Sequence, residues 1–200
     1  MLIHAFVPHS RVNGPGVRAV VYFQGCSLSC TGCWNPATHA FTGATRTVED
    51  IAERIARAHQ THRIDGVTFS GGEPMQQATD LLALIQRLKC ARPEISIGMY
   101  SGYTERELED GRFWTSCGAG HETRRQLWSE IKQCLDFAVL GRFVAAKPSK
   151  LPIRTSANQT LRLFSDRYSE DLFNSLEVEV HIEPQGLTQI TGFPLSGLPA

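Results

Sequence analysis

Three cysteines, Cys26, Cys30 and Cys33, stand close together in the segment GCSLSCTGCWNP. Thiolates bind zinc or iron, but a structural zinc site takes four ligands and commonly draws them from two C-x-x-C pairs. The spacing here is C-x-x-x-C-x-x-C, with no second C-x-x-C elsewhere in the chain. Three thiolates on a four-iron cluster leave one iron open, which is useful where a small molecule must bind iron directly. Residues 24–36 are therefore predicted to form an iron–sulfur cluster loop.

A second element, SGGEP at residues 70–74, directly follows a predicted strand. Its glycine pair, Gly71 and Gly72, lets the backbone approach a bound molecule closely, and Glu73 adds a carboxylate. Ligands of parallel sheets bind at the carboxyl ends of the strands, which is where this element lies. A GGE sequence taken alone is an ordinary turn. Downstream of a three-cysteine loop it indicates a ligand site, and it argues against a plain zinc or iron–sulfur binding module.

Two periodic patterns supply the framework that positions both motifs. Short β-branched and aromatic runs predict six strands, at residues 17–23, 66–70, 95–101, 137–141, 160–164 and 178–182. Apolar residues at helical spacing predict helices at about 47–59, 81–88 and 127–135, the first with Thr47 as its N-cap. Alternation of strands and helices is typical of βαβ units and a parallel sheet.

The predicted fold class is α/β, an open partial (β/α) barrel with about six mostly parallel strands. Six strands are too few for a closed eight-stranded barrel, and strand twist with right-handed crossovers curls an open sheet. Residues 1–200 contain no repeat, low-complexity tract or linker, so we expect a single domain. Residues 111–120 and 142–158 are predicted to be irregular.

The composition excludes several classes of protein. Lys+Arg and Asp+Glu are equal at 20 each, so no basic surface for nucleic acid or anionic membrane is expected. No apolar run is long enough to span a membrane, and the N-terminal segment MLIHAFVPHS lacks the pattern of a signal peptide. The expected compartment is the cytoplasm, where thiols stay reduced and clustered cysteines indicate metal or redox chemistry.

The cysteine spacing, followed by an aromatic residue, resembles the signature of the radical S-adenosylmethionine superfamily, and SGGEP resembles that family's Gly-Gly-Glu-Pro element. The resemblance implies that the cysteines hold one 4Fe-4S cluster, whose open iron chelates the amino and carboxylate groups of S-adenosylmethionine. An electron from the cluster then cleaves the sulfonium and yields a 5′-deoxyadenosyl radical. The residues expected to bind this cofactor are Gly32, Trp34, Gly71, Gly72, Glu73, Tyr100 and Ser101. No side chain is expected to act as a catalytic acid or base.

Further segments resemble the activating enzymes of glycyl radical enzymes, in the single-cluster branch that includes the activase of anaerobic ribonucleotide reductase. These segments are NGPGVR (13–18), YSGYT (100–104), LGRF (140–143), SANQTL (156–161) and ITGFP (190–194). Asn13 and Leu140 depart from the pattern, because aspartate is usual at both positions. Several relatives of pyruvate formate-lyase activase insert a cysteine-rich ferredoxin module before GGE. No cysteine lies between Cys33 and Gly71, so a second cluster of that type is not expected.

The resemblance implies a function: abstraction of a hydrogen atom from a glycine of a partner glycyl radical enzyme, similar to anaerobic ribonucleotide reductase. It also implies an electron donor of the flavodoxin or ferredoxin type. The alternative is a stand-alone radical enzyme that modifies a peptide or a small metabolite. A cap over the substrate would favour that alternative, and residues 111–120 could form part of one.

Overall fold

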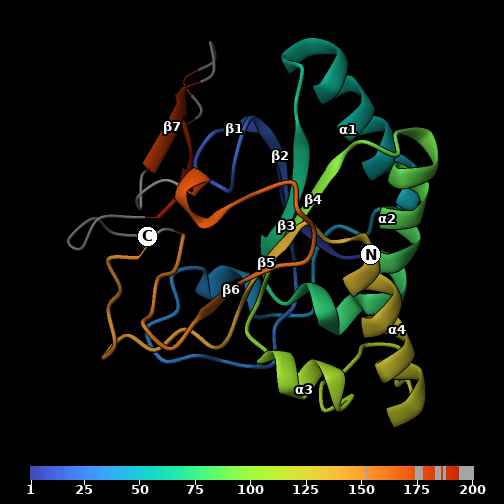
Figure 1. The fold of residues 1–200 in the computed structure, drawn as a ribbon, viewed down its shortest axis with the longest axis vertical. Coiled ribbons are helices and arrows are strands. Elements are labelled where there is room, and N and C mark those ends of the chain that lie inside the picture. The colour runs from blue at the N-terminus through green and yellow to red at the C-terminus, as the bar shows by residue number, and fades with distance from the viewer. Residues whose placement is uncertain (152, 174–177, 183–185, 187, 194–200) are drawn as a thin grey trace.

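The computed structural model describes residues 1–151, 153–173, 178–182, 186 and 188–193. A six-stranded sheet in the order β1-β2-β3-β4-β5-β6 forms the centre of the molecule (Figure 1). Its strands are β1 (Ile3–Ser10), β2 (Arg18–Phe23), β3 (Gly66–Gly71), β4 (Ser96–Ser101), β5 (Phe137–Leu140) and β6 (Thr160–Leu163). Strands β2 to β5 run parallel, and β1 and β6 are antiparallel edge strands. The sheet is not closed. The parallel strands and the helices that accompany them confirm the predicted α/β class with a mostly parallel sheet.

The long helices lie together on one face of the sheet (Figure 1). The helices are α1 (Val48–His62), α2 (Ala78–Ala91), α3 (Glu105–Glu109) and α4 (His121–Cys134), with short 3₁₀ turns η1 (Pro36–Thr38), η2 (Pro74–Gln77) and η3 (Glu170–Leu172). Thr47 caps α1 as predicted, because its side chain accepts a hydrogen bond from the Asp50 backbone. Apolar residues of α1, α2 and α4 pack with alternate residues of β2 to β5 in the main core. No helix in the described part of the chain combines the length and apolar character needed to cross a bilayer.

Three strands differ from the prediction. Strand β1 was not predicted, because its sequence contains Pro8 and its pairing with β2 shifts register twice, which breaks the alternation that marks a strand. The predicted strand at 178–182 exists as β7 (Val178–Ile182), but it lies outside the main sheet and pairs with β8 (Thr188–Gly192), which was not predicted. Alternating hydrophobicity indicates a strand but not the strand with which it pairs. The sequence therefore did not show whether residues 178–182 join the main sheet or a separate hairpin.

The inner face of the sheet is closed at its amino end by a group that we call the floor: Arg18, Phe137, Tyr168 and Phe173. The Arg18 guanidinium is fully buried and lies 5.0 Å from the centre of the Phe137 ring. It donates to Thr68 Oγ1 at 2.7 Å, and burial lowers its pKa. The Phe137 ring also contacts Tyr168 and Phe173 edge to face. The floor leaves the opposite, carboxyl end of the strands open for a site.

Candidate functional site

A cavity of about 340 Å³ opens at the carboxyl ends of the parallel strands, where α/β sheets place their ligands. The predicted site residues that line it are Cys26, Cys30, Cys33, Trp34, Gly71, Gly72, Glu73, Tyr100 and Ser101. Gly32 does not line the cavity. Its φ of +73° is the left-handed conformation that favours glycine, so it shapes the turn between Cys30 and Cys33. The fold therefore brings the two sequence motifs to one site.

Backbone hydrogen bonds fix the cysteine loop against the segment that follows it. Cys26 N donates to His39 O at 3.0 Å, and Cys33 N donates to Cys30 O at 3.1 Å. Gln76, which is fully buried, accepts from Ser27 N at 2.9 Å and donates to Ser27 Oγ at 2.7 Å. Gln76 was not predicted as a site residue, although it lies two positions after SGGEP. Its amide ties the cysteine loop to the turn after β3.

The three thiols line one cavity, so they are candidate ligands of one metal centre. A four-iron cluster takes one thiolate on each of its irons, so three thiolates would leave one iron open. Burial raises the pKa of Cys26 to about 11 and also raises that of Cys33. Binding of iron must therefore displace protons from these thiols. Three thiols at one cavity are the donor set that an open-iron cluster takes.

The glycine pair brings two stretches of backbone together. Gly71 has a φ of +96°, and a Cβ there would lie 2.6 Å from Phe23 N. A Cβ on Gly72 would overlap Gly25 O. Glu73 N donates to that carbonyl oxygen at 2.9 Å. The two glycines therefore allow the end of β3 to pack closely against the backbone of Phe23 and Gly25, at the start of the cysteine loop.

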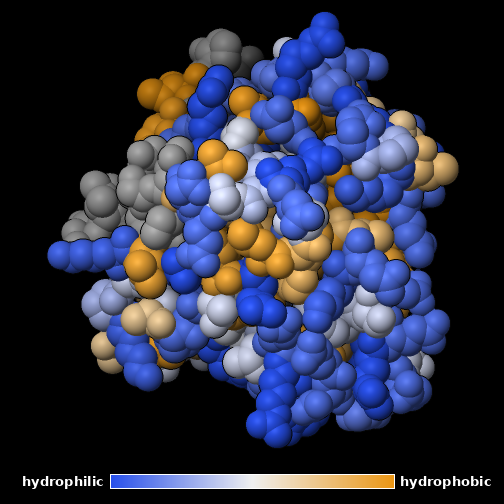
Figure 2. Space-filling view, viewed as in Figure 1, coloured by the Kyte–Doolittle hydropathy of each residue, from blue (hydrophilic) through white to orange (hydrophobic). Residues whose placement is uncertain are grey.

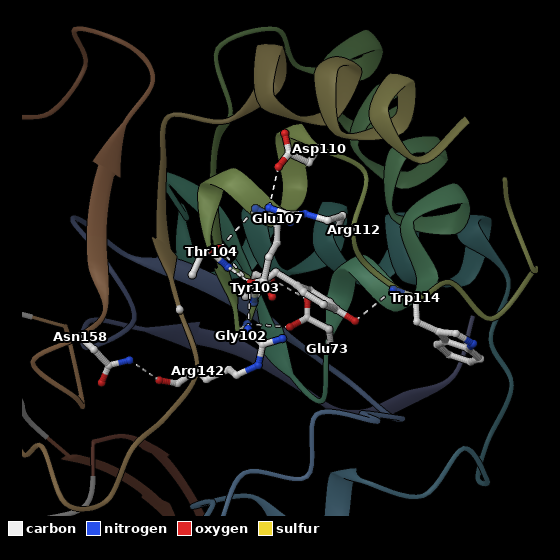
Figure 3. Close-up of polar contacts among 12 residues, drawn as sticks. Glu73, Gly102, Tyr103, Thr104, Glu107, Asp110, Arg112, Trp114, Arg142 and Asn158 are labelled. Carbon is white, nitrogen blue, oxygen red and sulfur yellow. Dashed lines mark hydrogen bonds and ion pairs between the residues drawn. The ribbon is translucent and has the colours of Figure 1, made fainter. Parts of the chain in front are cut away.

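The Glu73 carboxylate joins the ends of β3 and β4 (Figure 3). Only 1% of Glu73 is exposed, and its carboxylate accepts hydrogen bonds from Met75 N at 2.9 Å, Ser101 Oγ at 2.9 Å and Gly102 N at 2.7 Å. A carboxylate has about four acceptor positions, so one remains for a ligand. Burial raises the pKa of Glu73 to about 7, against the opposing effect of these hydrogen bonds. Ser101 lines the cavity and also donates a hydrogen bond to Glu73.

Arg142, from the LGRF segment, places a cation beside the site. Its Nη1 lies 2.8 Å from Glu107 Oε2, and its guanidinium lies 5.5 Å from the centre of the Tyr103 ring (Figure 3). Burial raises the pKa of Glu107, but hydrogen bonds from Arg142 and Thr104 outweigh it and lower that pKa to about 2. The Arg142 charge also lowers the pKa of Glu73. No role was predicted for this arginine, although it belongs to the LGRF segment.

An aromatic wall closes one side of the cavity. The Trp34 ring lies 5.6 Å from that of Phe143 and 6.4 Å from that of Phe193, and Tyr100 lies 6.1 Å from Phe193. Tyr100 lines the cavity, and its hydroxyl is buried without a hydrogen-bond partner among the described residues. Phe143 and Phe193 were not predicted, although each belongs to a quoted segment. Flat apolar faces of this kind suit a purine ring.

Comparison with known proteins identifies a family and several relatives. Residues 12–162 match the family described as "4Fe-4S single cluster domain". The anaerobic ribonucleoside-triphosphate reductase-activating protein of Vibrio cholerae serotype O1 is 30% identical over 82% of this chain and 99% of that protein. The protein of that name from Salmonella typhi is 33% identical over 80% and 97%. The pyruvate formate-lyase-activating enzyme of Clostridium pasteurianum is 38% identical over 44% and 38%. The chain belongs to the 4Fe-4S single-cluster family, among the radical S-adenosylmethionine activating enzymes.

Proposed function

We propose that this protein activates an anaerobic ribonucleotide reductase by removing a hydrogen atom from the Cα of one of its glycines. One observation carries the proposal: three thiols, a buried carboxylate and an aromatic wall line a single cavity at the carboxyl ends of the strands. The relatives that this chain matches over nearly their whole length are activating proteins of that reductase.

The bound cluster and S-adenosylmethionine would together supply a 5′-deoxyadenosyl radical and free methionine. The glycine hydrogen would pass to the 5′ carbon, so the products are 5′-deoxyadenosine and a glycyl radical on the partner. The electron would come from a donor of the flavodoxin or ferredoxin type. The chain would contribute binding and orientation, without a catalytic acid or base.

Each group of site residues has its own part in this proposal. Cys26, Cys30 and Cys33 would hold the cluster through three of its irons. Glu73 would accept from the amino group of S-adenosylmethionine with its one free acceptor position. The backbone at Gly71 and Gly72, together with Tyr100 and Ser101, would complete that side of the site. Trp34, joined by Phe143 and Phe193, would pack against the adenine, and Gly32 would shape the turn between two cluster ligands.

The setting of the reaction follows from the chemistry of the thiols. They must stay reduced to bind iron, so we place the protein in the cytoplasm. The balanced charge offers no attraction to nucleic acid or to anionic membranes. Residues 1–200 would act as one domain, because the aromatic wall combines Trp34 near the N-terminus with Phe193 near the C-terminus.

The experiment is an anaerobic incubation of the reconstituted protein with reductant, S-adenosylmethionine and the anaerobic ribonucleotide reductase of the same genome. Electron paramagnetic resonance should show a glycyl doublet, and 5′-deoxyadenosine should increase with it. A reductase in which the target glycine is replaced by alanine is the control, and it should give no doublet. Rapid formation of 5′-deoxyadenosine with a small peptide or metabolite, and no doublet with the reductase, would favour the stand-alone alternative.

A further inference from the structure

The β7–β8 hairpin is attached to the body of the protein by its polar face. Glu179 and Thr191 are opposite each other in the hairpin register, so they share one face. Glu179 Oε2 accepts from Arg11 N at 3.0 Å. The Thr191 hydroxyl accepts from Asn13 Nδ2 at 2.8 Å and lies 2.5 Å from the Tyr22 hydroxyl oxygen. These contacts fix which side of the hairpin faces the body of the protein.

The opposite face of the hairpin is apolar and exposed. Val178, Val180 and Ile182 alternate along β7, and Ile190 pairs directly with Val180, so the four side chains lie on one face, which we call the hairpin strip. Val180 is 53% exposed, Ile190 61% and Ile182 73%. In Figure 2 hydrophobic atoms gather at the upper left, where Figure 1 places β7. These are the highest exposures among the large apolar side chains of the described residues.

This arrangement reverses the usual polarity of a sheet on a protein surface. Antiparallel sheets normally turn their apolar face to the core and their polar face to water. A contiguous exposed apolar patch is instead typical of a site where another molecule binds. Since the polar contacts of Glu179 and Thr191 hold the hairpin in the reversed orientation, the exposed strip follows from the fold.

The hairpin strip is continuous with the cavity. Val178, Val180 and Ile190 line the cavity that also contains the three cysteines, and Ile182 extends the strip outward from it. A chain that enters the cavity beside the hairpin would pass over this strip. The strip carries no charged side chain, so it favours an uncharged, apolar segment over an acidic or basic one. The side chains at 178, 180 and 182 project in a line along β7, which suits an extended chain.

We propose that the hairpin strip is the docking surface for the segment that flanks the target glycine in the partner glycyl radical enzyme. The inference rests on the proposed function and adds where, and through what chemistry, the partner binds. An extended apolar stretch beside the glycine lies on Val180, Ile182 and Ile190, and this contact directs the glycine into the cavity.

The test measures binding separately from chemistry. Ile182→Ser removes the most exposed side chain of the strip, and Ile182 does not line the cavity. The dissociation constant for the anaerobic ribonucleotide reductase of the same genome, measured by anaerobic calorimetry, should rise about tenfold, as for an interface residue worth about 1.4 kcal/mol. Iron content and reductant-driven cleavage of S-adenosylmethionine without partner should stay at wild-type levels.

Two further variants separate docking from general effects on the surface. Leu172→Ser is the matched control, because Leu172 is 48% exposed and lies on η3 at a different cavity. Its dissociation constant should equal that of the wild type. Thr188→Val adds an apolar side chain directly opposite Ile182 on the same face, and it should tighten binding. This gain-of-affinity variant keeps the test valid even if Ile182→Ser disturbs the hairpin.

The outcomes distinguish this inference from the proposed function. Wild-type affinity in both Ile182→Ser and Thr188→Val overturns the docking surface, even if the glycyl doublet forms. Weaker binding of Ile182→Ser and tighter binding of Thr188→Val support it, even if no doublet appears and the proposed function fails. A wild-type protein that does not bind the reductase overturns the inference. Self-association of this chain that is lost in Ile182→Ser also overturns it, because the strip would then be occupied by a second copy.

Discussion

Replacement of Glu73 by glutamine tests how the buried carboxylate serves the cofactor. The carboxylate takes three hydrogen bonds from the protein and keeps one acceptor position free. Glutamine offers a single oxygen, so Glu73→Gln leaves at least one of the three donors without an acceptor and removes the charge. A hydrogen bond to a charged group contributes about 1.5–3 kcal/mol. If the free position accepts from the cofactor's amino group, affinity for S-adenosylmethionine should fall roughly 10- to 150-fold.

The pH dependence sharpens this prediction. Burial raises the pKa of Glu73 to about 7, so the group loses its proton near neutral pH. Only the ionised carboxylate gives the charge-assisted bond, and affinity in the wild type should therefore rise as pH increases through about 7 and fall below it. In Glu73→Gln this component of the pH dependence should disappear. The amino group of free S-adenosylmethionine titrates equally in both experiments, so the difference between the two curves reports the effect of the Glu73 charge.

Calorimetry on anaerobic, cluster-loaded protein across this pH range is the assay, and Ser101→Ala is the matched control. Ser101 donates to Glu73 Oε1 at 2.9 Å, and this hydrogen bond lowers the Glu73 pKa. Its loss should raise the pKa and shift the affinity curve to higher pH while keeping its shape. Unchanged affinity in Glu73→Gln, with the wild-type pH curve retained, would refute a cofactor contact and leave Glu73 as a residue that only joins β3 to β4.

Three further predictions concern the cluster, the aromatic wall and the floor. Cys30→Ala should prevent stable loading, because two thiolates leave two irons open; wild-type iron and sulfide content in the variant, or one zinc per natively purified chain, would contradict the cluster assignment. Phe193→Ala should weaken S-adenosylmethionine binding about three- to tenfold by removing an aromatic contact, with iron content unchanged, and calorimetry checks this. Arg18→Met should lower the free energy of unfolding by about 3 kcal/mol, because buried acceptors such as Val67 O lose their donor. Urea denaturation of the apoprotein measures this change. An unchanged free energy of unfolding would contradict the role given to Arg18 in the floor.

The sequence predicted those parts of the site whose residue types have few other uses. Three cysteines at fixed spacing and a glycine pair after a strand limit the local chemistry strongly, and the structure brings both motifs to one cavity. The α1 cap at Thr47 was predictable for the same reason, because the signal is local. Features that depend on residues close together in the sequence could therefore be predicted.

The remaining features depend on contacts between distant segments. Phe193 and Arg142 are an ordinary aromatic residue and an ordinary cation until the fold brings them to Trp34 and Glu73. The reversed orientation of the hairpin depends on Thr191 meeting Asn13, far away in the chain. Strand β1 escaped prediction because its irregular register hides the alternation. Each of these features depends on a contact between distant segments, and the periodicity of one segment does not predict such a contact.

The floor has a consequence for the order of events in the proposed reaction. In the described part of the chain, Arg18, Phe137, Tyr168 and Phe173 close the amino end of the strands, and the cavity opens at the opposite end. Under the proposed function, a docked protein loop would cover that opening. S-adenosylmethionine would then enter before the loop docks, and 5′-deoxyadenosine and methionine would leave after the loop withdraws. Each encounter with a partner would give one turnover, so the rate of partner departure would set the upper bound on the rate of activation.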